Sequence, residues 1–146
     1  MGAWRDVMLT IEESEEKKAF LRQYLKSKRL QAGIEDEIAT LRASAILPPS
    51  GSDGMPHGTT KSDLSGYAAK IDDLERKLKG ELEHGWELRR KVIETIETLP
   101  SETEKMVLRF RYINGWKWER IAEEMFYTYQ HVHKIHSKAL MNLEIN

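Results

Sequence analysis

The segment from Thr128 to Leu143 concentrates the side chains best suited to chemistry in this 146-residue sequence. It holds two lysines and three histidines, and it contains no aspartate or glutamate. The chain as a whole has a formal net charge of −1, so the lack of acids is local rather than general. A helix-length segment without carboxylates can approach a polyanion without repulsion, which indicates nucleic-acid binding.

Metal binding and catalysis are the other chemistries that this composition raises. Only His133 and His136 share a helical face, and no Glu, Asp or Cys ligand stands nearby, so we expect no metal site. His136 lies within about 40° of Val132 around the helix, which favours a hydrogen-bonded core histidine. The sequence has no phosphate-binding glycine loop, HExxH motif or nucleophile elbow. We therefore expect no enzymatic activity and no cofactor.

Three short helices are expected to position this segment. Ser101 and Glu104 fit a capping box, and the helix that they begin should end near the C-cap signal Asn114-Gly115. A short helix from about residue 117 to 125 follows, and Thr128 is the expected N-cap of the last helix. Two helices separated by a three-residue turn, after a preceding helix, predict a helix-turn-helix.

Helical geometry divides the last helix into two faces. The expected inward residues are Val132, Ile135, Ala139, Leu140 and Leu143. The outward residues are Gln130, Lys134, Ser137, Lys138 and Met141, with His133 at the flank. In a helix-turn-helix, outward positions near the start of the second helix enter the major groove. The residues expected at base edges or adjacent phosphates are therefore Tyr129, Gln130, His133, Lys134 and Ser137.

The polar side chains of this surface suit different DNA groups. Gln130 can bond adenine with two hydrogen bonds, and Lys134 can reach the O6 and N7 atoms of guanine. Lys138, Lys117 and Arg120 are better placed for phosphate contacts, which position the protein without specifying sequence.

Two long helical patterns precede the helix-turn-helix. We expect an N-terminal helical arm at residues 1–47, a flexible loop rich in Pro, Gly and Ser at 48–63, and a second arm at 64–98. The helix-turn-helix domain then occupies 99–146. The predicted fold is all-α: a long helical hairpin or coiled-coil arms followed by a small three-helix domain.

The arms carry apolar residues at alternating spacings of four and three, with Thr10 and Glu13 as a capping box before the first seam. The first seam comprises Phe20, Tyr24, Ser27, Gln31, Ile34, Ile38, Leu41 and Ala45. The second comprises Leu64, Tyr67, Ile71, Leu74, Leu78, Glu81, Gly85, Leu88, Val92, Thr95 and Leu99, widened by Leu82, Trp86, Ile93 and Ile96. Equal arms favour an antiparallel hairpin within one chain, and a coiled-coil dimer built from the same seams is the alternative.

Composition limits the setting in which the chain works. It has no cysteine, which excludes a disulfide scaffold and a thiolate zinc site and is compatible with the cytoplasm. No run of 18 apolar residues is present, so we expect no membrane span.

The last third of the sequence resembles region 4 of sigma factors of the sigma-70 family. Residues 99–112 look like the opening of that region, and Trp118–Met125 is similar to its first helix-turn-helix helix, where an E-x-I-A core recurs. Val132–Leu140 is similar to its recognition helix, including the closing K-A-L motif. Phe126 stands where such turns usually have glycine, and a positive φ there would be unfavourable for phenylalanine.

The order of arm, Ser/Gly/Pro loop, second arm and sigma-like domain resembles a narrower family. This family comprises the late-gene transcriptional regulators of the RinA and ArpU type, found in phages and prophages of Gram-positive bacteria. Residues 129–136 also look like their recognition helix. The resemblance implies a small DNA-binding activator that lacks the promoter-melting regions of a sigma factor.

The leading interpretation is a sequence-specific activator of phage late genes, in the cytoplasm of the host bacterium. The expected partners are double-stranded DNA, host RNA polymerase and a second copy of the chain, because two half-sites raise the effective concentration of a weakly basic motif. The alternative is a structural coiled-coil protein whose helical bundle contacts protein rather than DNA. A small terminase subunit is a third interpretation.

Overall fold

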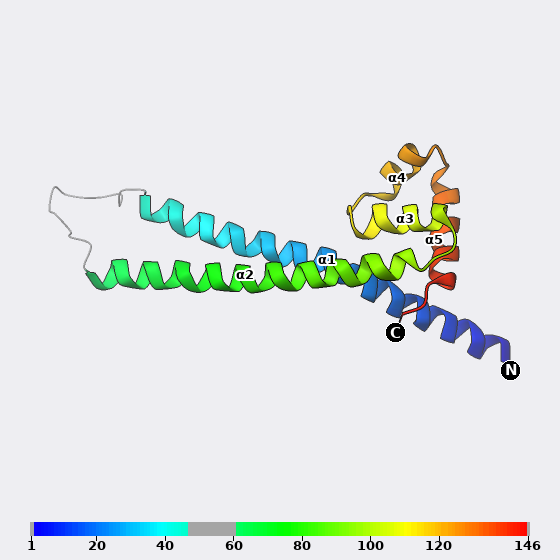
Figure 1. Ribbon diagram of the computed structural model, residues 1–146, viewed down its shortest axis with the longest axis horizontal. Helices are drawn as coiled ribbons and strands as arrows, with labels where there is room; N and C mark the ends of the chain where they lie inside the picture. Colours follow the sequence, from blue (N-terminus) through cyan, green and yellow to red (C-terminus); the bar gives the residue numbers. More distant parts are fainter. Residues whose placement is uncertain (1, 47–60, 146) are drawn as a thin grey trace. The chain divides into compact units, whose positions relative to one another are not determined.

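The computed structural model describes residues 2–46 and 61–145, and this part of the chain forms helices without any strand (Figure 1). The helices are α1 (Gly2–Ile46), α2 (Lys61–Glu97), α3 (Glu102–Tyr112), α4 (Trp118–Met125) and α5 (Tyr129–Asn142). The all-α fold expected from the sequence is confirmed, with two long helices before three short ones.

The long helices begin earlier than the sequence predicted. Thr10 and Glu13 lie inside α1, so the prediction that they cap its start is wrong. After Gly2 no residue of the segment before Thr10 is a strong helix breaker, and extending an existing helix costs little. α2 begins at Lys61, within the predicted loop, and the rest of that loop, residues 48–60, lies outside the described residues.

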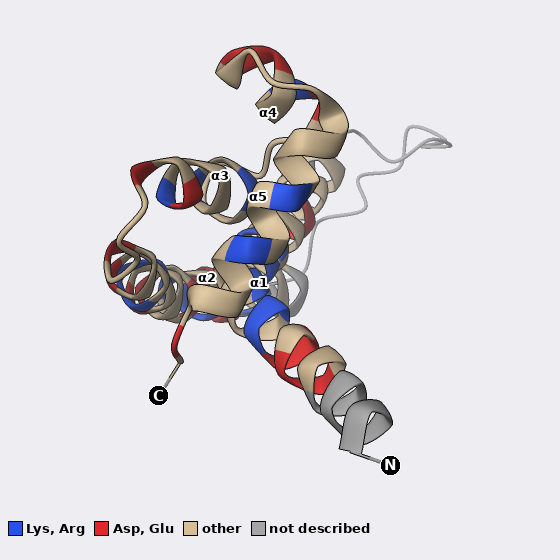
Figure 2. Ribbon diagram, turned by 90° about the vertical axis from the view of Figure 1, so that its right-hand side faces the viewer, with Lys and Arg blue, Asp and Glu red and all other residues tan. Residues whose placement is uncertain are grey.

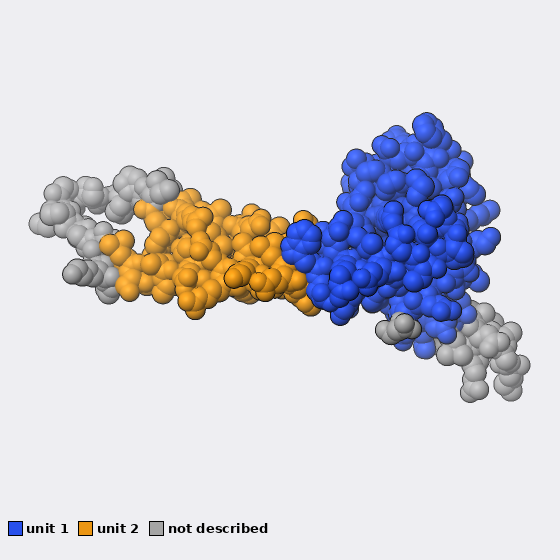
Figure 3. Space-filling view, in the orientation of Figure 1, with its two compact units in different colours: residues 1–26, 85–146 blue, residues 27–84 orange. Residues whose placement is uncertain are grey.

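Two compact units divide the described chain, and α1 and α2 contribute to both (Figure 3). The first unit comprises residues 1–26 and 85–146, and the second comprises residues 27–84.

The second unit is an antiparallel hairpin in which the two arms pair within one chain. Seam residues of α1 are buried, namely Ser27, Gln31, Ile34 and Ile38. Their α2 counterparts are half-buried, namely Tyr67, Ile71, Leu74, Leu78 and Glu81. The ends of the predicted seams, Ala45 and Leu64, are exposed. Leu82 is also exposed, so the wider stripe predicted for α2 does not extend there, because Glu81 and Leu78 already occupy the face toward α1.

A polar layer interrupts the apolar seam of the hairpin. The Ser27 hydroxyl donates to Oε1 of Glu81 at 2.8 Å, and Gln31 Nε2 donates to Ser27 Oγ at 3.2 Å. Gln31 Nε2 also lies 3.4 Å from the Glu81 carbonyl oxygen. A buried polar layer of this kind fixes the register of paired helices at some cost in stability, because any shift leaves a polar group without a partner.

The first unit has a core to which both long helices contribute. Its larger cluster contains Leu21 from α1, Val92 and Ile96 from α2, Leu99, Leu108 and Tyr112, and Ala139, Leu140 and Leu143 at the end of the chain. Phe20, Tyr24, Ile113 and Ile145 pack around it. A smaller cluster of Val107, Ile121, Ala122 and Val132 joins α3, α4 and α5. Trp86, on the outer side of α2, is exposed rather than part of the predicted stripe.

The start of α3 differs in one detail from a capping box. The backbone N–H of Glu104 donates to Ser101 Oγ at 3.3 Å, so Ser101 is the N-cap as predicted. The Glu104 carboxylate is buried and does not reach back to Ser101. It accepts instead from the Asn142 side chain, at 3.2 and 3.3 Å from its two oxygens. Glu104 thereby connects the start of α3 to the last residue of α5.

Replacing Leu21 with alanine should destabilise the whole first unit. Leu21 of α1 is fully buried in the cluster that α1 forms with α2, α3 and α5. Leu21→Ala should therefore lower the free energy of unfolding by about 2–5 kcal/mol. Urea unfolding of the full chain measures this change. Leu30→Ala is the control, since Leu30 is 52% exposed on the same helix and its loss should change the free energy by less than about 0.5 kcal/mol. Equal effects of the two substitutions would contradict this account of the core.

Candidate nucleic-acid interface

Helices α4 and α5 form the helix-turn-helix, joined by a tight turn. The N–H of Tyr127 donates to the Ala122 carbonyl at 3.0 Å, which closes the end of α4. Thr128 is the N-cap of α5, and its hydroxyl accepts from the His131 N–H at 3.1 Å. The N-cap predicted from the sequence is therefore confirmed, and it fixes the angle at which α5 starts.

Phe126 occupies the left-handed region at the centre of this turn, with φ 58° and ψ 38°. It is the one non-glycine residue with a positive φ in the described part of the chain. This conformation costs an L-residue about 1–2 kcal/mol. The side chain is 94% exposed, so packing within the chain does not offset that cost.

The apolar face of α5 points inward as expected. Val132, Ala139, Leu140 and Leu143 are buried, and Ile135 is half-buried. Val132 contacts the α4 side of the core, whereas the other three buried residues belong to the cluster that includes α1 and α2.

The opposite face of α5 carries most of the residues predicted to contact DNA. Tyr129, Gln130, Lys134, Ser137 and Lys138 are all exposed. Figure 2 shows the two lysines as blue bands on α5, with no acidic residue on this helix. Gln130, Lys134, Ser137 and Lys138 thus share one helical face, and Tyr129 is exposed at the first turn of α5. Contacts of these residues with DNA stay a prediction.

His133 lies less freely than the other predicted contacts. Its ring is half-buried, 4.4 Å from the Trp118 ring centroid and 4.4 Å from that of Tyr129. Its Nε2 atom is buried without a hydrogen-bond partner. Because the His133 ring packs against the Tyr129 ring, His133 positions Tyr129 on this surface. Direct contact between His133 and a nucleobase stays a prediction.

The two predicted phosphate contacts outside α5 lie at the start of α4. Lys117 is the exposed N-cap residue of that helix. The guanidinium of Arg120 stacks over the Trp116 ring at 3.9 Å, and Trp116 stacks in turn on Phe110 at 4.5 Å. This stacking restricts the Arg120 side chain while the residue remains exposed.

His136 is a core histidine, as predicted. It is buried, and its Nε2 lies 2.8 Å from the Tyr112 hydroxyl. Burial lowers the pKa of His136 to about 4, and the positive charge of Lys18 acts in the same direction. Burial also raises the pKa of the Tyr112 hydroxyl. Both groups are therefore neutral near pH 7 and share one hydrogen bond beneath the surface of α5.

The neutral state of His136 predicts acid sensitivity. Its pKa is about 4 in the folded chain and about 6.5 when unfolded, so below pH 6.5 the unfolded chain binds a proton that the folded chain does not. The contribution of the neutral His136 to the free energy of unfolding should be fully present above pH 6.5. It should decrease by at most about 3 kcal/mol as the pH decreases to 4. Urea unfolding at several pH values tests this, with His136→Gln as the comparison. If both proteins lose stability equally over this range, His136 is not the group responsible.

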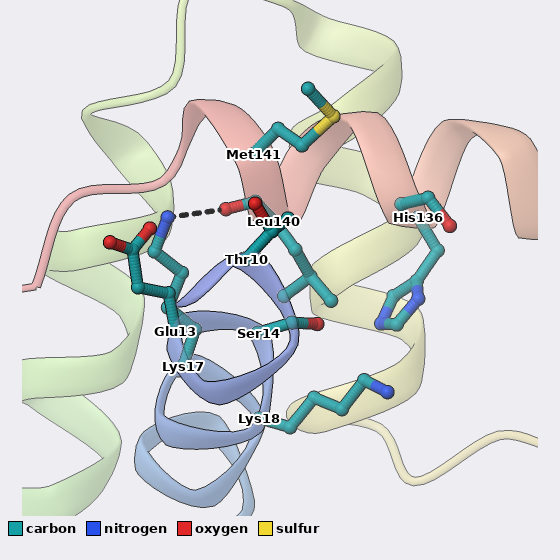
Figure 4. A pocket seen from close by; sticks show the side chains of 9 residues that line it. Thr10, Glu13, Ser14, Lys17, Lys18, His136, Leu140 and Met141 are labelled. Atoms are coloured by element: carbon teal, nitrogen blue, oxygen red, sulfur yellow. Dashed lines mark hydrogen bonds between the residues drawn. The ribbon is translucent and has the colours of Figure 1, made fainter. Parts of the chain in front are cut away.

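The sequence did not indicate that α1 packs against α5. The ammonium of Lys17 donates to the Leu140 carbonyl at 2.8 Å, which satisfies one of the free carbonyls near the end of α5 (Figure 4). A cavity of about 360 Å³ lies beside this bond. Its lining residues are Thr10, Glu13, Ser14, Lys17, Lys18, His136, Ser137, Leu140 and Met141. A lysine that caps another helix leaves no local sequence signal, because its partner is a backbone atom 123 residues away.

No group of three or more His, Cys, Asp or Glu side chains is arranged to hold a metal in the part of the chain that the structure covers. Among the described residues, no helix is long and apolar enough to cross a membrane.

Residues 96–144 match the family model of sigma-70, region 4. No curated protein and no solved structure matches the chain. The matched residues form a region-4-like helix-turn-helix, which defines the class of this domain and indicates a DNA-binding regulator.

Proposed function

We propose that this chain is a sequence-specific transcriptional activator of phage late genes, of the RinA and ArpU type. In this proposal α5 enters the major groove of a late promoter, in the cytoplasm of the host bacterium. The observation that carries it is the acid-free exposed face of α5, where Gln130, Lys134 and Lys138 lie on one surface. The arrangement of two long helices before a region-4-like domain agrees with the resemblance to this family.

The proposed reading of DNA divides the exposed residues into two groups. Gln130 and Lys134 lie near the start of α5 and suit base edges, whereas Lys138 lies further along and suits a phosphate. The start of α5 adds the backbone N–H groups of Tyr129 and Gln130, which have no partner within the helix and favour a phosphate. No acidic residue occupies the first turn of α5 to repel that phosphate.

We also propose that the chain binds DNA as a homodimer and contacts host RNA polymerase. A recognition helix with two lysines supplies little affinity alone, and two linked half-sites increase it through effective concentration. The seam of the hairpin is occupied within one chain, so in this proposal the dimer uses another surface.

We propose no enzymatic activity. Glu75 of α2 pairs with Arg42 of α1, and Glu97 pairs with Lys105 and Arg109 of α3. The other ion pairs described for the long helices join a carboxylate to a basic side chain one turn away, as in Arg76 with Asp72 and Arg90 with both Glu87 and Glu94. Such exposed pairs on helix surfaces are a solvated face rather than a catalytic site.

DNA binding is tested by footprinting of the DNA next to the gene with the purified full chain across a salt series. Protection should appear at low salt and weaken as salt increases, because phosphate contacts release counterions. Absence of protection at every salt concentration would overturn the proposal in favour of a protein-contacting helical bundle.

Substitutions should separate the two groups of contacts. Gln130→Ala should cost about 1–3 kcal/mol at the preferred site and relax the preference at one base pair. Lys138→Ala should weaken binding to all sequences and reduce the salt slope by about one unit. Binding titrations against the preferred and a scrambled duplex measure both effects. Unchanged affinity in both variants would show that this face of α5 does not meet DNA.

The homodimer is tested by sedimentation of the full chain at tens of micromolar. A dimer should be the main species. Tight DNA binding by a chain that sediments only as a monomer would contradict it.

A further inference from the structure

Phe126 combines two features that are unfavourable in the free chain. It adopts a left-handed conformation that glycine or asparagine would adopt more readily, and its phenyl ring is 94% exposed to water. No ring contact joins Phe126 to another aromatic residue in the described part of the chain. Neither the turn nor the core therefore gains from a phenylalanine at this position, which points to a role outside the folded chain.

The neighbouring aromatic residues behave differently. Tyr127 packs edge-on against His131 with ring centroids 4.6 Å apart, and Tyr129 packs against His133 at 4.4 Å. Both rings are held by partners within the chain. Phe126 alone among the three projects without such support, so it is free to meet another molecule.

The position of Phe126 favours DNA as that molecule. Two residues separate it from Tyr129, the first residue of α5, and this stretch spans at most about 10 Å. The start of α5 is the end expected in the major groove. From Phe126 to Leu143 the sequence has no carboxylate, so a phosphate backbone can approach from the α5 side of Phe126 without repulsion. The nearest acids, Glu123 and Glu124, are exposed on the α4 side.

The major groove presents one apolar group, the C5-methyl group of thymine, and a phenyl ring can pack against it. We propose that Phe126 contacts a thymine methyl group at the edge of the DNA site and thereby contributes to sequence preference. This inference rests on the proposed DNA-binding function and adds a specificity-determining residue in the turn, outside α5. A contact with a protein partner is the alternative that the test must separate.

The test uses the full chain and a duplex that it selects from a pool of random-sequence DNA. Each thymine of that duplex is then replaced singly by deoxyuridine, which lacks only the C5-methyl group. Loss of one buried methyl group corresponds to about 0.8 kcal/mol, so the wild-type chain should bind about fourfold more weakly when the contacted thymine is replaced. Replacement at thymines outside the site should change little.

Phe126→Asn supplies the protein side of the comparison. Asparagine tolerates the left-handed conformation, so this variant should unfold at the same temperature as the wild type or a few degrees higher. It should nevertheless bind the thymine duplex several-fold more weakly, and it should no longer distinguish thymine from deoxyuridine at the critical position. Weaker binding by a protein that is at least as stable cannot be attributed to misfolding.

Two control variants separate this contact from other effects. Trp86→Ala removes an exposed aromatic residue, 69% accessible on α2, and should leave affinity and the fourfold preference unchanged. Lys138→Ala should weaken binding to all duplexes while keeping the preference for thymine.

The outcomes distinguish this inference from the proposed function. If Phe126→Asn binds like the wild type and still prefers thymine, the inference is overturned and DNA binding stands, which leaves a protein contact for the turn. A wild-type chain that binds every deoxyuridine duplex as tightly as the thymine duplex also overturns the inference alone. If the wild-type chain selects no duplex at all, both the function and this inference are overturned.

Discussion

Burial of the inner face of α5 is the constraint on which the rest of the first unit depends. The N-terminal half of that face packs on α3 and α4 through Val132, whereas the C-terminal half packs on the long helices through Ala139, Leu140 and Leu143. Leu21 of α1 belongs to the second group. The residues that resemble sigma region 4 therefore make up only part of a folding unit, and α1 and α2 supply the rest of its core. Because the inner face of α5 is packed near both of its ends, the helix presents its outward residues in one fixed orientation.

A second constraint is the layer of aromatic and imidazole rings beneath that outward face. The rings of Trp118 and His133 lie 4.4 Å apart, those of Trp118 and His136 4.7 Å, and the Arg111 guanidinium lies 4.5 Å from the Trp118 centroid. Such a layer supports the exposed Tyr129 through His133 and keeps water from the buried His136. The exposed face of α5 is thus polar, while the layer of rings beneath it is apolar and requires a neutral imidazole.

The sequence predicted well wherever local spacing determines structure. The helix starts at Ser101 and Thr128, the faces of α5 and the core position of His136 all follow from capping chemistry and helical periodicity. The left-handed conformation of Phe126 does not follow from its residue type, because a positive φ is unfavourable for phenylalanine. The predicted start of α1 at Thr10 is wrong, because a sequence that fits a capping box can also occur inside a helix. Periodicity could not decide between pairing within one chain and between chains, since the same seam serves both. Features that join distant segments lay beyond such reasoning: Glu104 accepts from Asn142, and Lys17 donates to a backbone carbonyl, so neither partner can be found from spacing along the chain.

The polar layer of the hairpin limits how its arms can change in length. Ser27 and Gln31 meet Glu81 at one level, so residues added to one arm between this layer and the far end must be matched on the other arm. Unmatched additions would place an apolar side chain opposite a polar one. Changes of a whole heptad in both arms keep every pairing. Among related chains, the two arms should therefore differ in length by the same multiple of seven residues. The number of residues between the polar layer and the end of the hairpin should change only by whole heptads.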